Sequence, residues 1–299
     1  MLKIAIIGFG RMGLSHVSIL RGLLAGRQHK ISVFDPSIVS LGMAKALIPD
    51  AKIRRSFEAS DLEDQDYVLF TSPPFDRAGE CAMAEKLKGR VFIEKPIVAT
   101  LPANAMSGYV LQHSPLTERL REELRGKKIE RIDGLMQTPM DFSEATGWRA
   151  SKYGEISGEF LGHVVTMALA PLSQNISRVD HSSFKVIEAS TNVLKASIML
   201  NGEIKFNIEL RGGSGSLRKT GYRVDYRGPE CALSHDLYTI KRGGAVVCDV
   251  AQNQTGTQFY LRGFEYSKQM QRLISGEGDV LSRKLICEID HLSQLSREQ

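Results

Sequence analysis

The fold is decided near the start of the chain by the stretch Ile4-Ala5-Ile6-Ile7-Gly8-Phe9-Gly10-Arg11-Met12-Gly13. Its apolar half predicts a buried strand, and its glycines predict a tight turn that leads into a helix over residues 16–24. A second strand is predicted over residues 31–34, and it ends at Asp35. A strand, a glycine turn, a helix and a second strand that ends in an acid form the unit that binds a dinucleotide.

Each glycine of the turn has a separate physical role. Gly8 permits the tight turn, Gly10 lets the backbone approach a pyrophosphate, and Gly13 lets the helix pack closely on the strand. The helix N-terminus offers free N–H groups and a positive dipole end to the phosphates. The cofactor-binding residues predicted in the turn are Gly8, Phe9, Gly10, Arg11, Met12 and Gly13. The alternative is a domain that uses its glycines only for turns.

Asp35 favours NAD over NADP as the cofactor. Its carboxylate can accept hydrogen bonds from the adenosine ribose hydroxyls, and it would repel a 2′-phosphate. Pro36 and Ser37 supply no arginine for that phosphate, whereas Arg11 and Arg54 could still reach it after folding. We therefore expect NAD or NADP, with NAD preferred.

The composition is that of a globular protein with two domains. Of its residues, 42% are hydrophobic and 24% charged, as in ordinary globular domains. The chain has 299 residues, which is more than one hydrophobic core usually contains. No apolar run approaches the ~20 residues that span a bilayer, so no membrane segment is expected. The net charge of +5 favours anionic ligands such as cofactor phosphates or a nucleotide-linked substrate. Glutamates interleave the most basic segment, residues 119–131, so no nucleic-acid partner is expected.

The start of the chain and the cysteines predict a cytoplasmic location. A strand follows Met1-Leu2-Lys3 directly, so we expect no signal peptide. The cysteines are scattered, form no metal-like pairs and are expected to be reduced thiols. They are Cys81, Cys231, Cys248 and Cys287. No metal site is predicted.

Two further apolar runs extend the parallel sheet. Residues 67–70 lead into Ser72-Pro73-Pro74, and prolines just past a strand's carboxyl end shape a loop that faces the cofactor in doubly wound sheets. Residues 91–93 lead into Glu94-Lys95-Pro96. Pro102 leaves little room for a helix after Pro96, and the last strand is predicted at residues 109–111.

These motifs resemble those of the Gfo/Idh/MocA oxidoreductases. The glycine turn, Asp35, the Ser72-Pro73-Pro74 loop and Glu94-Lys95-Pro96 occur in this order in that family, and the resemblance covers residues 1–120 better than the remainder. In the family the lysine faces the nicotinamide and the substrate hydroxyl, and a cis bond before the proline is common. Glu94 would orient Lys95 or the nicotinamide end. Arg77 replaces a histidine that is often found in the Pro-Pro loop.

Beyond residue 116 the sequence pattern changes to one typical of strands. Apolar and polar residues alternate over residues 204–211, which predicts a sheet with one buried and one wet face. Further strands are predicted at 129–135, 184–189, 195–200, 222–226, 237–241 and 245–250, and helices at 116–125, 264–275 and 281–295. The predicted fold is an α/β Rossmann nucleotide-binding domain, residues 1–115, followed by an α+β substrate and oligomerisation domain with an open, mainly antiparallel sheet, residues 116–299. The resemblance implies a homodimer or homotetramer through the C-terminal sheet.

A second candidate cluster follows the first strand of that sheet. The family has a glycine-rich run here, then an aspartate and a histidine four residues later, and this chain has Gly158, Glu159 and His163. An acid and a histidine at i and i+4 share one helix face, and a histidine suits removal of a hydroxyl proton as hydride leaves. The resemblance implies that His163 is the acid–base, that Glu159 positions substrate, and that Trp148 and Arg149 contact nicotinamide or substrate. The alternative for His163 is a core or capping histidine.

Together these features predict an NAD(P)-dependent oxidoreductase of CH–OH groups. Its substrate would be a secondary alcohol or ketone of a sugar, nucleotide sugar or cyclic polyol, possibly anionic. One alternative is a sensor or regulatory protein that binds cofactor and sugar without turnover, because Glu159 and Thr166 stand where the family usually has aspartates. Another is a reductase of an imine or tetrapyrrole-type substrate, which no sequence feature separates from sugar oxidation.

Overall fold

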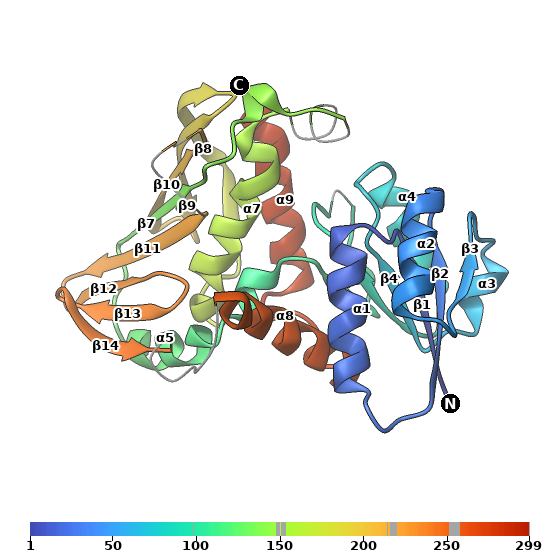
Figure 1. Ribbon diagram of the computed structural model, residues 1–299. Helices are drawn as coiled ribbons and strands as arrows, with labels where there is room; N and C mark the ends of the chain where they lie inside the picture. The colour runs from blue at the N-terminus through green and yellow to red at the C-terminus, as the bar shows by residue number, and fades with distance from the viewer. Residues whose placement is uncertain are drawn as a thin grey trace. The chain divides into compact units, whose positions relative to one another are not determined.

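The chain forms two compact units in the computed structural model (Figure 1). The structure describes residues 1–97, 99–147, 150, 154–213, 215, 220–250 and 258–298. The first unit comprises Met1–Gly108 and Tyr266–Asp279, and the second comprises Tyr109–Glu265 and Val280–Gln299. The predicted domain limits of 1–115 and 116–299 stay a prediction.

The first unit contains a parallel sheet of six strands. They are β1 (Leu2–Ile7), β2 (His29–Phe34), β3 (Lys52–Arg54), β4 (Tyr67–Phe70), β5 (Arg90–Ile93) and β6 (Ala105–Ser107). Their order in the sheet is β3-β2-β1-β4-β5-β6. The chain therefore changes its direction of winding between β1 and β4, and ligands of doubly wound sheets bind at this point, outside the carboxyl ends of the strands. The predicted Rossmann fold is confirmed.

Apolar helix faces cover this sheet. The helices are α1 (Arg11–Leu23), α2 (Ile38–Leu47), α3 (Ser60–Glu63), α4 (Arg77–Ala84) and the part of α8 (Gln258–Ser275) that starts at Tyr266. One core cluster joins Ile6 of β1, Leu20 of α1 and Phe92 of β5 with Met270 and Leu273 of α8. Residues far apart in the sequence thus share one core.

The last strand of the first sheet lies earlier than predicted. The strand is β6, which pairs with Val91–Ile93, whereas Val110–His113 forms a short 3-10 helix, η1. Gly108 follows β6 and donates its N–H to the Ile93 carbonyl of β5 at 2.7 Å, and a Cβ on it would come within 2.6 Å of Glu94 Oε2. Tyr109, which belongs to the second unit as Asp290 does, is buried and donates its hydroxyl to Asp290. The apolar run at 109–111 therefore serves packing rather than strand pairing, and its prediction as a strand is wrong.

The C-terminal part of α8 covers the edge strand β6. Gln269 Nε2 donates to the Ser107 carbonyl at 2.9 Å, and Asp279 accepts hydrogen bonds from the Ser107 N–H at 2.8 Å and hydroxyl at 3.1 Å. The described residues between Pro96 and β6 form no helix. Edge strands are commonly protected by such a cover.

The second unit contains a sheet of eight strands. They are β7 (Arg131–Gln137), β8 (Val179–Ser190), β9 (Val193–Leu200), β10 (Ile204–Arg211), β11 (Gly221–Gly228), β12 (Cys231–His235), β13 (Thr239–Arg242) and β14 (Ala245–Asp249). Their order is β14-β13-β12-β11-β7-β10-β9-β8. The β7–β10 pair is parallel, and the other pairings among the described strands are antiparallel. The predicted open, mainly antiparallel sheet is confirmed, although β12 was not predicted.

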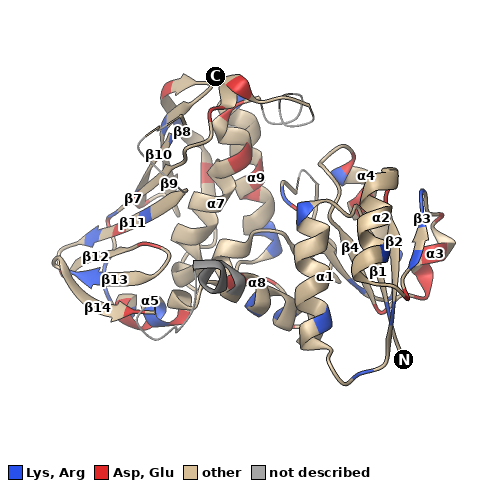
Figure 2. Cartoon of the chain, viewed as in Figure 1, with Lys and Arg blue, Asp and Glu red and all other residues tan. Residues whose placement is uncertain are grey.

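Helices pack on one face of this sheet, and charged residues lie along its strands (Figure 2). The helices are α5 (Leu116–Leu124), α7 (Ile156–Leu169) and α9 (Arg283–Glu298), with the short 3-10 helices η2 (Phe142–Glu144) and η3 (Ala170–Leu172). α7 packs on β7, β9, β10 and β11, and α9 packs on α7 and β8. Asp133 of β7 accepts hydrogen bonds from Arg131 and Asn207 and pairs with Arg227 at 3.3 Å. These charged residues alternate with the buried apolar residues of β7, so they lie on the other face of the sheet, which is polar, as predicted.

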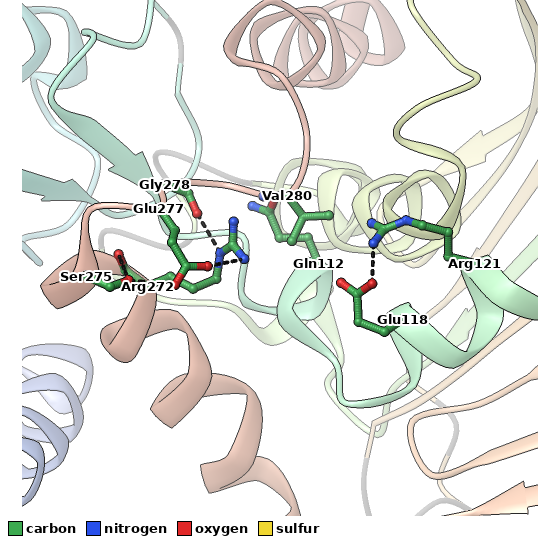
Figure 3. A network of polar contacts seen from close by, with 8 residues as sticks. All are labelled: Gln112, Glu118, Arg121, Arg272, Ser275, Glu277, Gly278 and Val280. Atoms are coloured by element: carbon green, nitrogen blue, oxygen red, sulfur yellow. Dashed lines mark hydrogen bonds and ion pairs between the residues drawn. The ribbon is translucent and has the colours of Figure 1, made fainter.

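Polar contacts fix the segments beside α8 and α9 (Figure 3). In the first unit Arg272 donates to the Gly278 carbonyl at 2.8 Å and pairs with Glu277 at 2.9 Å. In the second unit the Gln112 side chain accepts the Val280 and Leu281 N–H groups. No helix in the part of the chain that the structure describes is long and apolar enough to cross a membrane.

Candidate functional site

The glycine turn joins β1 to α1 at the change of winding. Gly8 has a φ of 88°, and a Cβ on it would come within 2.6 Å of the Ser72 backbone. A Cβ on Gly13 would overlap the Gly8 carbonyl. The protein's own packing therefore requires these two glycines.

Gly10 differs from the other two glycines of the turn. Its φ of −77° suits any residue, and a Cβ on it would meet no atom within 4 Å among the described residues. It is the N-cap of α1, whose first turn has no side-chain cap and no acid. Open space beside uncapped N–H groups is what a phosphate at a helix N-terminus needs. These residues fit the pyrophosphate of a dinucleotide.

Asp35 ties the glycine turn to the end of β2. The residue is buried, its Oδ2 accepts the Phe9 N–H at 2.6 Å, and its Oδ1 accepts the Ser37 N–H at 2.8 Å. A carboxylate oxygen has two acceptor positions, so both oxygens can still accept a ribose hydroxyl. Sequence reasoning found the acid but missed its bond to the turn, because that bond joins residues 26 apart.

A buried ion pair braces the loop after β4. Arg77, which is almost fully buried, donates to the Ser72 carbonyl at 2.7 Å and pairs with Glu80. Glu80 also accepts the Ser72 hydroxyl at 2.7 Å. Ser72 in turn lies against Gly8, and Thr71 donates its hydroxyl to the Gly8 carbonyl at 2.5 Å. The brace thus holds the loop on the glycine turn. The sequence signal that could have found it is the i, i+3 spacing of an arginine and a glutamate.

Breaking this brace should destabilise the first unit. Arg77→Met leaves the Glu80 carboxylate without its cation, and we expect it to lower the free energy of unfolding by about 3 kcal/mol. The measurement is urea denaturation. The matched control is Lys3→Ala, which breaks an exposed pair with Asp64 and should cost less than about 1 kcal/mol. The brace is not stabilising if Arg77→Met costs no more than Lys3→Ala.

Glu94 and Lys95 follow β5 at the carboxyl edge of the same sheet. The Glu94 carboxylate is buried and lies 2.9 Å from Nε2 of His16, which is fully buried on α1. Lys95 is half-buried, and the Lys95–Pro96 peptide bond is cis. Glu94 is therefore held by α1, a contact that sequence reasoning did not predict. Its predicted action on Lys95 or on a cofactor stays a prediction.

α7 of the second unit carries the other predicted catalytic residues. Glu159 and His163 lie one turn apart on this helix and are both half-buried. The ring centroids of His163 and Tyr109 are 5.8 Å apart at an interplanar angle of 85°. Gly162 permits this contact, because a Cβ on it would come within 2.6 Å of the Tyr109 ring. Thr166 donates its hydroxyl back to the His163 carbonyl at 3.1 Å.

The structure brings together the predicted residues of each unit. In the first, the glycine turn, Asp35 and the Ser72-Pro73 loop meet at the carboxyl ends of β1, β2 and β4. In the second, Glu159 and His163 share α7. Trp148 and Arg149 lie outside the described residues. The part of the chain that is described has no group of three or more His, Cys, Asp or Glu that could hold a metal.

Solved structures resemble the chain over almost its whole length. GenD2 from gentamicin A biosynthesis, in complex with NAD, has a TM-score of 0.75 at 14% identity, and the match covers 99% of this chain and 93% of that one. The WlbA (WbpB) dehydrogenase from Thermus thermophilus, in complex with NAD and UDP-GlcNAcA, has 0.71 at 16%, covering 99% and 95%. A myo-inositol dehydrogenase from Corynebacterium glutamicum has 0.71 at 15%, covering 99% and 96%. The chain has the Gfo/Idh/MocA fold.

The Gfo/Idh/MocA fold that the motifs predicted is thus confirmed over both units. No protein-family model matches the sequence, and the comparison with curated proteins gives no match either.

Proposed function

We propose that the chain is an NAD(P)-dependent dehydrogenase or reductase that acts on a secondary alcohol or ketone of a sugar, nucleotide sugar or cyclic polyol. The observation that carries this proposal is the contrast within the glycine turn. Gly8 and Gly13 are required by protein packing, whereas Gly10 borders open space at the uncapped start of α1. A turn used only for architecture has no need of a glycine at position 10.

The structures that share this fold support the substrate class. GenD2 and WlbA were each crystallised with NAD, WlbA also with UDP-GlcNAcA, and another neighbour is a myo-inositol dehydrogenase. The net charge of +5 suits an anionic substrate such as a nucleotide sugar.

The proposal gives each predicted catalytic residue a role. NAD(P), when bound, supplies the hydride acceptor or donor. Lys95 donates a hydrogen bond from its ammonium to the reacting oxygen and stabilises the negative charge that develops there. His163 takes the hydroxyl proton in the oxidative direction and returns it in the reductive direction, and Glu159 holds the substrate. Trp148 and Arg149 are proposed to contact nicotinamide or substrate.

The proposal also includes the cellular location and the oligomeric state of the enzyme. We propose a cytoplasmic location, because the four cysteines are scattered along the sequence and suit a reducing compartment. We propose a homodimer or homotetramer that forms through the second sheet.

A panel of substrates with both cofactors tests the proposed reaction. The purified protein is assayed for cofactor oxidation and reduction with nucleotide sugars, free sugars, sugar acids, cyclic polyols and cyclic imines. We expect turnover with at least one alcohol or ketone. Cofactor binding without turnover on any member of the panel would favour the sensor alternative, and turnover confined to imines would replace the substrate class.

A further inference from the structure

A histidine is buried on the core face of α1. The buried residues of this helix are Gly13, His16, Val17 and Leu20, so His16 is the polar side chain among them. It is fully buried, and its ring packs on Phe92 of β5 with ring centroids 4.5 Å apart. Burying a polar ring costs free energy unless it is hydrogen-bonded, and an aliphatic side chain fills such a place without that cost. The packing of α1 therefore does not by itself explain a histidine at this position.

The polar partner of this histidine is Glu94. His16 donates from Nε2 to Glu94 Oε1 at 2.9 Å, and its Nδ1 has no hydrogen-bond partner among the residues that the structure describes. The other carboxylate oxygen, Oε2, lies against Gly108, because a Cβ on that glycine would come within 2.6 Å of it. The Glu94 side chain is thus held between α1 and the residue that follows β6.

The backbone of Glu94 is held as well. Its N–H donates to the Phe70 carbonyl at the end of β4 at 2.9 Å. β4 therefore fixes the main chain and α1 fixes the side chain of the residue directly before Lys95, which is itself half-buried. The direction in which the chain leaves β5, and with it the place of the Lys95 ammonium, depends on these two contacts.

We propose that His16 is a positioning residue for Lys95, and that it acts by holding the Glu94 carboxylate. The inference rests on the proposed function, in which Lys95 donates to the reacting oxygen. Reacting groups must be held within about 0.5 Å of their productive positions, and hydrogen bonds from surrounding residues supply this. Because α1 begins at the glycine turn, one helix then places both the pyrophosphate and the lysine.

The first test measures the reactivity of Lys95 without a cofactor. Trace acetylation by acetic anhydride, quantified by mass spectrometry, gives the labelling of Lys95 relative to the exposed Lys88 of the same unit. His16→Leu releases Glu94, so we expect this ratio to rise at least about threefold as the half-buried ammonium becomes more accessible. His16→Gln, whose amide can donate in place of Nε2, should stay within about twofold of the wild-type ratio.

Two further variants separate this contact from a general loosening of the fold. Leu20→Ala removes apolar packing from the same face of α1 but leaves the His16–Glu94 hydrogen bond in place, so the ratio should stay within about twofold of wild type. Glu94→Ala breaks the same bond from the other side and should raise the ratio as His16→Leu does. It also decides the question if His16→Leu does not fold, and urea denaturation shows which variants are folded.

The second test measures catalysis with the best substrate of the panel. His16→Leu should lower kcat by about tenfold or more, because a small displacement of a reacting group is costly. The affinity for NADH should stay within about twofold of the wild-type value. In a Lys95→Ala background the same substitution should change kcat by less than about twofold, since a residue that acts through Lys95 has nothing left to position.

The inference is wrong if His16→Leu and Glu94→Ala leave the Lys95 labelling ratio unchanged, or if Leu20→Ala raises it as much as they do. It is also wrong if His16→Leu lowers kcat as strongly in the Lys95→Ala background as in the wild type, because the histidine would then act independently of the lysine. Failure of the proposed function is distinguishable from these results. The unmodified protein would then turn over no member of the panel, whereas the acetylation ratios, measured without a cofactor, still decide whether His16 positions Lys95.

Discussion

Lys95→Ala should lower kcat by about a thousandfold, while the affinity for NADH stays within about twofold of the wild-type value. Lys95 lies at the carboxyl end of β5, where a half-buried ammonium can donate to the reacting oxygen. The developing charge on that oxygen exists only in the transition state, so the loss falls on kcat rather than on cofactor binding. Steady-state kinetics with the best substrate of the panel, together with an NADH titration, measure both quantities.

The control for this variant is Lys88→Ala. Lys88 is exposed in the turn before β5, and removing it should leave kcat and NADH affinity unchanged. Lys95→Arg keeps the positive charge but moves its donors, so it should recover only part of the rate. Full turnover by Lys95→Ala would remove Lys95 from the mechanism.

Gly10→Val should weaken NADH binding by at least about tenfold, while lowering the free energy of unfolding by no more than the roughly 1 kcal/mol that a poorer N-cap residue costs. Valine is compatible with the φ of −77° at this position, and its Cβ would meet no described atom within 4 Å. Its branched side chain would instead occupy the space assigned to the pyrophosphate. Fluorescence titration measures the affinity, and thermal unfolding measures the stability.

Gly8→Ala is the matched comparison, and it should behave in the opposite way. Gly8 has a φ of 88° and lies against the Ser72 backbone, so an added Cβ is strained and should lower the free energy of unfolding by about 1–3 kcal/mol. If Gly10→Val binds NADH as tightly as the wild type, the open space beside Gly10 does not hold a pyrophosphate.

The sequence predicted those parts of the fold in which neighbouring residues determine the outcome. The apolar run of β1, the three glycines and Asp35 lie within one continuous segment, and each has a known local consequence. The alternation in β10 likewise matches its burial. Tyr109 shows where such reasoning fails, because its contact with Asp290 joins residues 181 apart in the sequence. From the sequence alone, an apolar run that forms a strand could not be distinguished from an apolar run that packs against helices.

The same distinction separates the predicted and the missed parts of the candidate site. Motif spacing located Asp35, Lys95 and His163, which lie in segments with local signals. The His16–Glu94 contact joins residues 78 apart, and no local pattern reports it. Strand β12 has short alternation that could have been seen, since Cys231, Leu233 and His235 are buried while its other residues are not.

Titration of the purified protein with NADH and NADPH tests the central claim most directly. The protein is first checked for co-purified nucleotide, and its folded state is verified by circular dichroism. The structure predicts saturable binding of at least one reduced dinucleotide with a Kd in the micromolar range. If a folded protein free of bound nucleotide binds neither, the glycine turn is only architecture and the proposed dehydrogenase function is wrong.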